Sequence, residues 1–176
     1  MTRSRWAGAC AALLLVAGCA ATGTAPAPAP TLSARLQRLE DVEQIRALLN
    51  EYGRRLDQRD FAGFAALFAA DGEWLGGFGQ AQGQAAIRAL MEASIPPRPA
   101  AAPDRRQHFF TNQSIRVDGD AATATSNWAF VIGGQSGAPQ LAFTGHYEDA
   151  LVREGGEWRF RRRRVLSDFP AAPPGG

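Results

Sequence analysis

The apolar residues of this chain change their spacing once, and that change limits the folds open to it. Between residues 36 and 56 they recur at steps of three and four, the spacing of an amphipathic helix. From residue 108 onward apolar and polar residues alternate, which is typical of half-buried strands. Helices followed by antiparallel hairpins predict an α+β domain, in which about three N-terminal helices pack on a strongly curved sheet that encloses a pocket.

The individual elements follow from this pattern and from the turn residues. A second helix, capped by Asp60, is expected to carry Phe61 to Phe68 and to close at Asp71-Gly72, and a third is expected over residues 84–93. Strands are expected at residues 73–75, 108–117, 121–132, 140–153 and 158–166. The Pro-rich stretch at residues 95–104 is long enough to form a rim or lid.

The first 19 residues have the order of a bacterial export signal. Arg3 and Arg5 precede an apolar run that ends in Val16-Ala17-Gly18-Cys19. The run is shorter than the ~20 residues that a membrane-spanning helix needs. The small residues before Cys19 resemble the lipobox of bacterial lipoproteins, which implies cleavage before Cys19 and a lipid on its thiol. The alternative is an ordinary secretory signal in which Cys19 has no special role.

This interpretation divides the chain into four parts. They are a signal peptide (1–18), a lipidated cysteine with an Ala/Pro linker (19–31), one folded domain (32–169) and a Pro/Gly tail (170–176). The lipid is then the only membrane attachment. Because Ala20 rather than Asp follows Cys19, we expect the periplasmic face of the outer membrane.

Charge and cysteine content exclude several classes of function for the mature domain. Removal of residues 1–18 takes away two arginines and no acid, which leaves 17 basic and 17 acidic residues. A near-neutral domain gives no support for nucleic-acid binding. Cys10 leaves with the signal and Cys19 is acylated, so no thiol is left for a disulfide or a nucleophile. Two histidines do not make a multi-histidine metal site, and we expect neither metal nor cofactor.

Several short motifs keep a fixed order along the domain. They are Tyr52-x4-Asp57, Asp60-Phe61, Leu67-Phe68-Ala69-Ala70-Asp71-Gly72, His108-Phe-Phe-Thr-Asn112, Ile115-Arg-Val-Asp-Gly-Asp-Ala121, Gly145-His-Tyr-Glu-Asp149 and Gly156-Glu-Trp158-Arg-Phe160. Over residues 39–165 they resemble the SnoaL-like branch of the nuclear transport factor 2-like superfamily. The resemblance implies a cone of three helices closing a curved sheet around a pocket, often in a homodimer formed through the outer face of the sheet.

The resemblance also implies a chemistry. Some relatives are cofactor-free lyases or isomerases: hexachlorocyclohexane dehydrochlorinase, bile acid dehydratase, scytalone dehydratase and polyketide cyclases. By sequence order, Asp57 and His108 match the proton-abstracting pair of the dehydrochlorinase, and Tyr52 matches a tyrosine of the bile acid dehydratase. Histidine suits proton abstraction near neutral pH, and a carboxylate on one ring nitrogen fixes its tautomer. Each of these three residues also has a structural alternative, in core packing or at a solvated helix end.

Other polar and aromatic residues are weaker candidates. Trp74, Asn112, Trp128 and His146 are expected to bind substrate, although core packing is the alternative for the tryptophans. Asp149 is a candidate partner for an arginine of the last strand. In the run of residues 159–164, strict alternation places Arg162 and Arg164 with Trp158 and Phe160, and Arg163 on the opposite face.

Two functions from different classes remain open at this stage. The first is an envelope-anchored lyase or isomerase for a small hydrophobic molecule, with His108 as base and Asp57 orienting it. The second is a tethered module that binds a small ligand or a protein partner without turnover. A homodimer is compatible with both.

Overall fold

A computed structural model of the chain describes residues 29–97, 106–134 and 137–169. The predicted signal peptide, Cys19, most of the expected lid and the tail after residue 169 lie outside the described residues. In the described part, no helix is both long enough and apolar enough to cross a membrane.

Helix α1 (Leu32–Gln58) is capped at both ends. The Thr31 hydroxyl accepts a hydrogen bond from the Ala34 backbone N–H at 3.2 Å. Arg59 adopts a left-handed conformation with φ 58°, and its N–H bonds back to the Leu56 carbonyl. The helix therefore ends at Gln58, which places Asp57 in its last turn. Of the predicted stripe, Ile45, Leu49 and Tyr52 are buried, whereas Leu36 and Leu39 at its start are exposed.

Two shorter helices follow and cover the other end of the sheet. Helix α2 (Phe61–Ala66) begins at Asp60, whose carboxylate accepts the Gly63 N–H at 2.9 Å. Helix α3 (Gln84–Ser94) buries Ile87 and Met91. Three helices packed against one sheet confirm the predicted α+β class.

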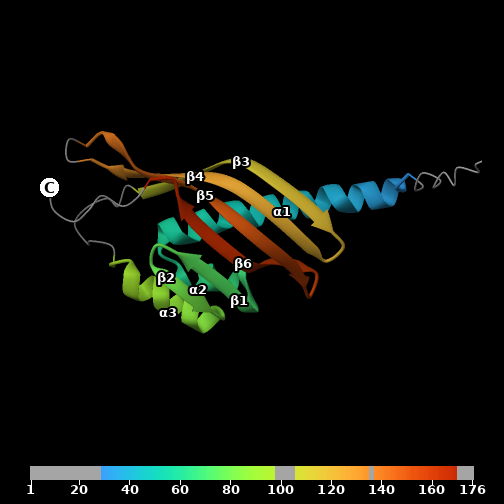
Figure 1. Ribbon diagram of the computed structural model, residues 1–176, viewed down its shortest axis with the longest axis horizontal. Coiled ribbons are helices and arrows are strands. Elements are labelled where there is room, and N and C mark those ends of the chain that lie inside the picture. The colour runs from blue at the N-terminus through green and yellow to red at the C-terminus, as the bar shows by residue number, and fades with distance from the viewer. Residues whose placement is uncertain (1–28, 98–105, 135–136, 170–176) are drawn as a thin grey trace, which may run out of the picture. The chain divides into compact units, whose positions relative to one another are not determined.

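Six strands form a single curved sheet that does not close. They are β1 (Phe68–Gly76), β2 (Gly79–Gln82), β3 (Arg106–Asp118), β4 (Ala121–Gly133), β5 (Pro139–Glu154) and β6 (Glu157–Ser167). Their order is β2-β1-β6-β5-β4-β3, and every neighbouring pair is antiparallel except β1 and β6. Figure 1 shows α1 crossing behind the long strands, while α2 and α3 lie beside β1 and β2.

Two expectations for the first half were wrong. The second helix does not reach Phe68, because Phe68 pairs in parallel with Phe160 and already belongs to β1. Strand β2 is absent from the expected strands, yet Gly79–Gln82 folds back on β1 and pairs with it. Phe68 is fixed by pairing with a distant residue and β2 by a hairpin with the strand before it, and local periodicity reports neither pairing.

Aromatic rings fill the space between α1 and the sheet. The Tyr52 ring lies 4.7 Å from Phe64, 5.6 Å from Tyr147 and 5.8 Å from Phe160, centroid to centroid. A Cβ on Gly53 would lie only 2.3 Å from the Phe110 ring, so glycine there lets α1 sit directly on β3. This close approach carries the end of α1 to the edge of the sheet.

Candidate functional site

Asp57 and His108, 51 residues apart in sequence, meet at the edge of the sheet. Asp57 Oδ1 lies 2.6 Å from His108 Nδ1, and Asp57 Oδ2 accepts the His108 backbone N–H at 2.9 Å. Their side chains are 19% and 12% exposed, so the pair is shielded but reachable. The predicted pair is therefore in direct contact, and its catalytic role stays a prediction.

The backbone explains why this contact forms. Strand β3 is an edge strand, so the N–H of His108 that points away from β4 needs a partner outside the sheet. The Asp57 carboxylate supplies it. A carboxylate in the last turn of a helix is disfavoured by the helix dipole, and the hydrogen bond from the His108 backbone N–H offsets part of that cost.

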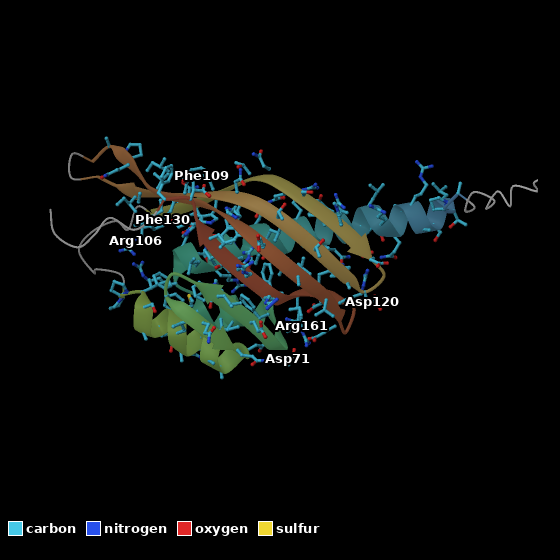
Figure 2. All side chains as sticks on the ribbon, viewed as in Figure 1. Asp71, Arg106, Phe109, Asp120, Phe130 and Arg161 are labelled. Atoms are coloured by element: carbon cyan, nitrogen blue, oxygen red, sulfur yellow. The ribbon has the colours of Figure 1, made fainter. Side chains whose placement is uncertain are left out.

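Away from Asp57, the surroundings of the His108 ring are apolar. The His108 ring stacks on Phe130 at 4.4 Å between centroids. Beside this stack is a hollow of about 240 Å³, lined by Arg106, Gln107, Val131, Ile132, Gly133, Gly137 and Pro139. Figure 2 shows Arg106 and Phe130 together at this end of the sheet, with Asp120 at the opposite end. In the described residues this hollow is lined by strand ends and the β4–β5 hairpin rather than by the helices.

Tyr52 and Trp74 lie deeper, in the core. The Trp74 indole N–H donates to the Tyr52 hydroxyl at 3.0 Å. Burial raises the pKa of the Tyr52 phenol, and burial raises that of Tyr147 well above its usual value. Both phenols therefore stay protonated at neutral pH.

A buried ion pair lies on the same inner face. Arg163 Nε and Nη2 donate to the two carboxylate oxygens of Asp149 at 2.7 and 2.8 Å, and both side chains are 0% exposed. The guanidinium carbon is 4.0 Å from the centre of the Tyr52 ring and 4.1 Å from that of Tyr147. Burial opposes its charge, but the attraction and hydrogen bonds of Asp149, together with the two phenols of Tyr52 and Tyr147, outweigh burial and raise the pKa of Arg163.

The face predicted for Arg163 was wrong. Ala150 pairs with Arg162, whereas the next residue, Leu151, pairs with Phe160, so β6 carries one extra residue at Arg161. This β-bulge reverses the alternation and turns Arg163 toward the core. The outward arginines pair with surface acids, for example Arg161 with Asp71 at 2.8 Å (Figure 2).

Three buried polar atoms near Tyr147 have no hydrogen-bond partner in the described part of the chain. They are Arg163 Nη1, Trp128 Nε1 and Ser126 Oγ. Ser126 is paired with Tyr147 in the sheet, and the Trp128 ring lies 5.9 Å from the Tyr147 ring. A buried polar group left without a hydrogen-bond partner costs about 1–3 kcal/mol.

Two predicted binding residues lie elsewhere. Asn112 is exposed at an irregularity of β3, with φ 52°. His146 points to the outer face of β5, opposite to Tyr147, and its Nδ1 lies 3.1 Å from Asp168. The structure does not bring either residue to the Asp57–His108 pair. Within the described ranges, no group of three or more His, Cys, Asp or Glu residues is placed to hold a metal ion.

The residues that sequence reasoning missed here are Tyr147 and the inward role of Arg163. Asp149 was correctly considered as the partner of an arginine on the last strand. A run of four arginines gives no sign of where a bulge falls, so the inward arginine had no signal in the sequence. The arrangement offers a shielded imidazole–carboxylate pair, an aromatic wall and unpartnered donors.

Comparison with known proteins identifies the family of the chain. Residues 37–164 match the family described as a SnoaL-like domain. An NTF2-like protein with a cystatin-like fold from Novosphingobium aromaticivorans is 31% identical, with 80% of this chain and 90% of that chain covered and a TM-score of 0.66. ActVI-ORFA from Streptomyces coelicolor is 30% identical, with 72% and 96% covered and a TM-score of 0.63.

A protein of unknown function from Mycobacterium tuberculosis is 26% identical, with 76% of this chain and 75% of that chain covered and a TM-score of 0.66. Among proteins of curated function, none is similar enough in sequence to match. On the family match over residues 37–164 and the shared NTF2-like fold, this chain belongs to the SnoaL-like domain family.

Proposed function

We propose that Asp57 and His108 form the proton-transfer centre of a cofactor-independent lyase or isomerase for a small hydrophobic molecule. The observation that carries this proposal is the 2.6 Å contact between His108 Nδ1 and Asp57 Oδ1 at a largely shielded position. A carboxylate on Nδ1 leaves Nε2 as the basic nitrogen and stabilises the imidazolium that forms.

The proposed lyase step balances without an oxidant or reductant. His108 Nε2 removes a proton from a carbon of the substrate, and the C–H electron pair becomes the new C=C bond. The leaving group departs from the adjacent carbon with its bonding electrons, and a departing hydroxide takes up the proton held on His108 Nε2 and leaves as water, which returns His108 to its neutral form. In an isomerase the same proton returns from His108 to a different carbon of the substrate.

The inner face favours a flat apolar substrate that carries an acceptor oxygen. The rings of Phe130, Trp128 and Tyr147 follow one another along the inner face of β4 and β5, away from His108. Trp128 Nε1 and Arg163 Nη1 are N–H donors without a partner in the described residues. Such donors stabilise an oxygen that gains negative charge as the proton leaves carbon.

The test begins with the ligand carried by the purified protein, identified by native mass spectrometry, and then follows its turnover in D2O. The wild type is expected to eliminate a group from this molecule or to introduce deuterium into it. His108→Gln should lower that rate by about 10²–10⁴-fold. His146→Gln is the matched control, since His146 faces the outside of the sheet, and it should keep the wild-type rate. Equal rates in the wild type and His108→Gln would contradict the proposal.

The same experiment separates catalysis from simple binding. If the wild type binds the molecule but neither converts it nor exchanges its protons, the domain is a ligand-binding module. Trp128→Phe retains the ring and removes the indole N–H, so it should weaken binding of an oxygen-bearing ligand by about tenfold in either case.

We also propose that Cys19 carries a lipid that anchors the domain to the cell envelope, on the periplasmic face of the outer membrane. The support is the order of basic, apolar and small residues before Cys19, with Ala20 after it. Cells that express the full chain should incorporate labelled palmitate into it, and the protein should fractionate with the outer membrane. Cys19→Ala should lose the label, whereas Cys10→Ala should keep it. An unlabelled wild-type protein would refute the anchor.

A further inference from the structure

The first part of α1 extends past its own sheet. Residues 31–40 are all exposed, and burial begins at Asp41. Figure 1 shows this part of the helix running beyond the ends of the strands. We call residues 32–40 the overhang. It carries three leucines, Leu32, Leu36 and Leu39, that are 80%, 55% and 67% exposed.

These leucines lie on the side of the helix opposite to the one that is buried farther along. At 3.6 residues per turn, Leu36 is turned by about 180° from Ile45, and Leu39 by about 180° from Leu48, so the leucines face away from the side that packs against the sheet. In the overhang the leucines are spaced by four and then three residues, which is the seam of a pair of helices that coil around each other. In heptad terms Leu32 and Leu39 occupy d positions and Leu36 an a position. A seam this narrow fits one partner helix rather than a second sheet.

From this face we infer that the overhang pairs in parallel with the overhang of a second copy of the chain. Charge favours that partner and that direction. Arg35 falls at the g position before Leu36, and Glu40 at the e position after Leu39. In a parallel pair the g residue of one helix faces the e residue five positions later in the other. The pair of helices therefore has two equivalent contacts, each between Arg35 of one copy and Glu40 of the other. An antiparallel pair would bring like charges together.

No ion pair among the described residues of the same chain competes for the charged residues of the overhang. In the described part of the chain, neither Arg35 nor Glu40 takes part in an ion pair. The next a and d positions are Glu43 and Arg46, which are exposed and bond to each other at 2.7 Å. The seam therefore ends where each helix passes onto its own sheet.

A lipid surface fits the overhang less well than a second copy of the chain does. The overhang carries two arginines and one glutamate, which falls short of the cluster of basic residues that anionic headgroups attract. The seam spans less than two heptads, whereas stable coiled coils use three or four. The pairing therefore depends on concentration, and confinement of the chains near one another strengthens it.

Cysteine cross-linking tests the pairing and its direction in the full chain expressed in bacteria. Parallel pairing places identical residues side by side, so Leu39→Cys should oxidise to a disulfide-linked dimer. Its cross-linked fraction should exceed that of Thr125→Cys, on the outer face of β4, on the order of tenfold. The chain without an introduced cysteine measures the background from Cys10 and Cys19.

The alternatives give different results. Cross-linking between Leu32→Cys and Leu39→Cys chains of different size, without self-linking of Leu39→Cys, would indicate an antiparallel pair and overturn the inference. Preferential linking of Thr125→Cys would place the interface on the sheet and overturn it too. Binding of the chain to anionic vesicles that is lost in Leu36→Glu, without cross-linking, would assign the face to lipid and overturn it as well.

Charge reversal separates a pairing role from a local structural one. In the Leu39→Cys background, Arg35→Glu or Glu40→Arg should each lower the cross-linked fraction by about two- to threefold. The combined swap Arg35→Glu/Glu40→Arg restores opposite charges across the pair and should restore the cross-linked fraction. Failure of the swap to restore it would contradict the parallel register.

Discussion

The chain carries two histidine–aspartate pairs with the same chemistry and very different surroundings. His108 Nδ1 lies 2.6 Å from Asp57, and His146 Nδ1 lies 3.1 Å from Asp168. The first pair is mostly shielded, whereas the side chains of the second are 44% and 45% exposed. The carboxylate of Asp57 also accepts the backbone N–H of His108, and the ring stacks on Phe130.

The comparison teaches that residue type alone does not make a proton-transfer site. His146 points to the outer face of the sheet, where water screens Asp168 and either side chain can turn away. His108 is held at its backbone and at its ring, by an element 51 residues distant. A held, shielded imidazole keeps one tautomer and one direction, which is what general base catalysis requires.

The largest expected difference between the pairs is in turnover. Asp57→Asn removes the charge that stabilises the imidazolium and lets the wrong tautomer form, so kcat for the proposed substrate should fall by about 10²–10⁴-fold. Asp168→Asn should leave kcat within about twofold. Steady-state kinetics on both variants, with ligand affinity measured alongside, makes the comparison. A similar loss of kcat in both variants would show that the two pairs do not differ in this way.

A third pair, Asp149–Arg163, extends the comparison to full burial. Asp149→Asn leaves the Arg163 guanidinium buried without its counter-charge, so the free energy of unfolding should fall by about 3–5 kcal/mol. Urea denaturation followed by circular dichroism measures it. The double change Asp149→Leu/Arg163→Met removes both charges and should recover most of the loss. If the double variant is no more stable than Asp149→Asn, packing rather than charge holds this part of the core.

Removal of the Asp57 side chain should have an intermediate effect on stability. Asp57→Ala leaves the backbone N–H of His108 without an acceptor, so the free energy of unfolding should fall by about 1–3 kcal/mol. Asp168→Ala should change it by no more than about 0.5 kcal/mol. The two variants are compared in the same urea titration. Equal, small effects would show that the backbone contact contributes little.

The smallest expected difference between the two pairs is in how salt changes their contribution to the free energy of unfolding. At 1 M NaCl the Debye length is about 3 Å, so the effect of Asp168→Ala should disappear. The effect of Asp57→Ala should persist, because its hydrogen bonds are shielded from solvent ions. Repetition of the urea titrations at low and high salt tests this, and loss of the Asp57→Ala effect in salt would place that pair among ordinary surface ion pairs.

Much of the fold was predictable because it rests on local periodicity. The stripe from Leu36 to Leu56 predicted α1, and alternation predicted the four long strands within one or two residues at most ends. The errors fall where a distant partner decides. Phe68 joins a strand because of Phe160, and the extra residue at Arg161 turns Arg163 inward.

The candidate site was predicted only in part. The family resemblance named Asp57 and His108, and the structure brings them into contact. His146 and Asn112, the weaker candidates for binding substrate, lie away from that contact. Position along a strand sets which face a side chain takes, but a bulge changes the face, and no spacing rule locates a bulge in a run of similar residues.

By itself, the sequence determined the kinds of element and their order, the near-neutral charge of the predicted mature domain and the apolar stripe of the first helix. Only the tertiary structure decided which histidine is shielded, which arginine is buried and how much of that stripe the sheet covers. The reason is physical. Periodicity is a property of neighbouring residues, whereas burial depends on where chain segments dozens of residues apart come together.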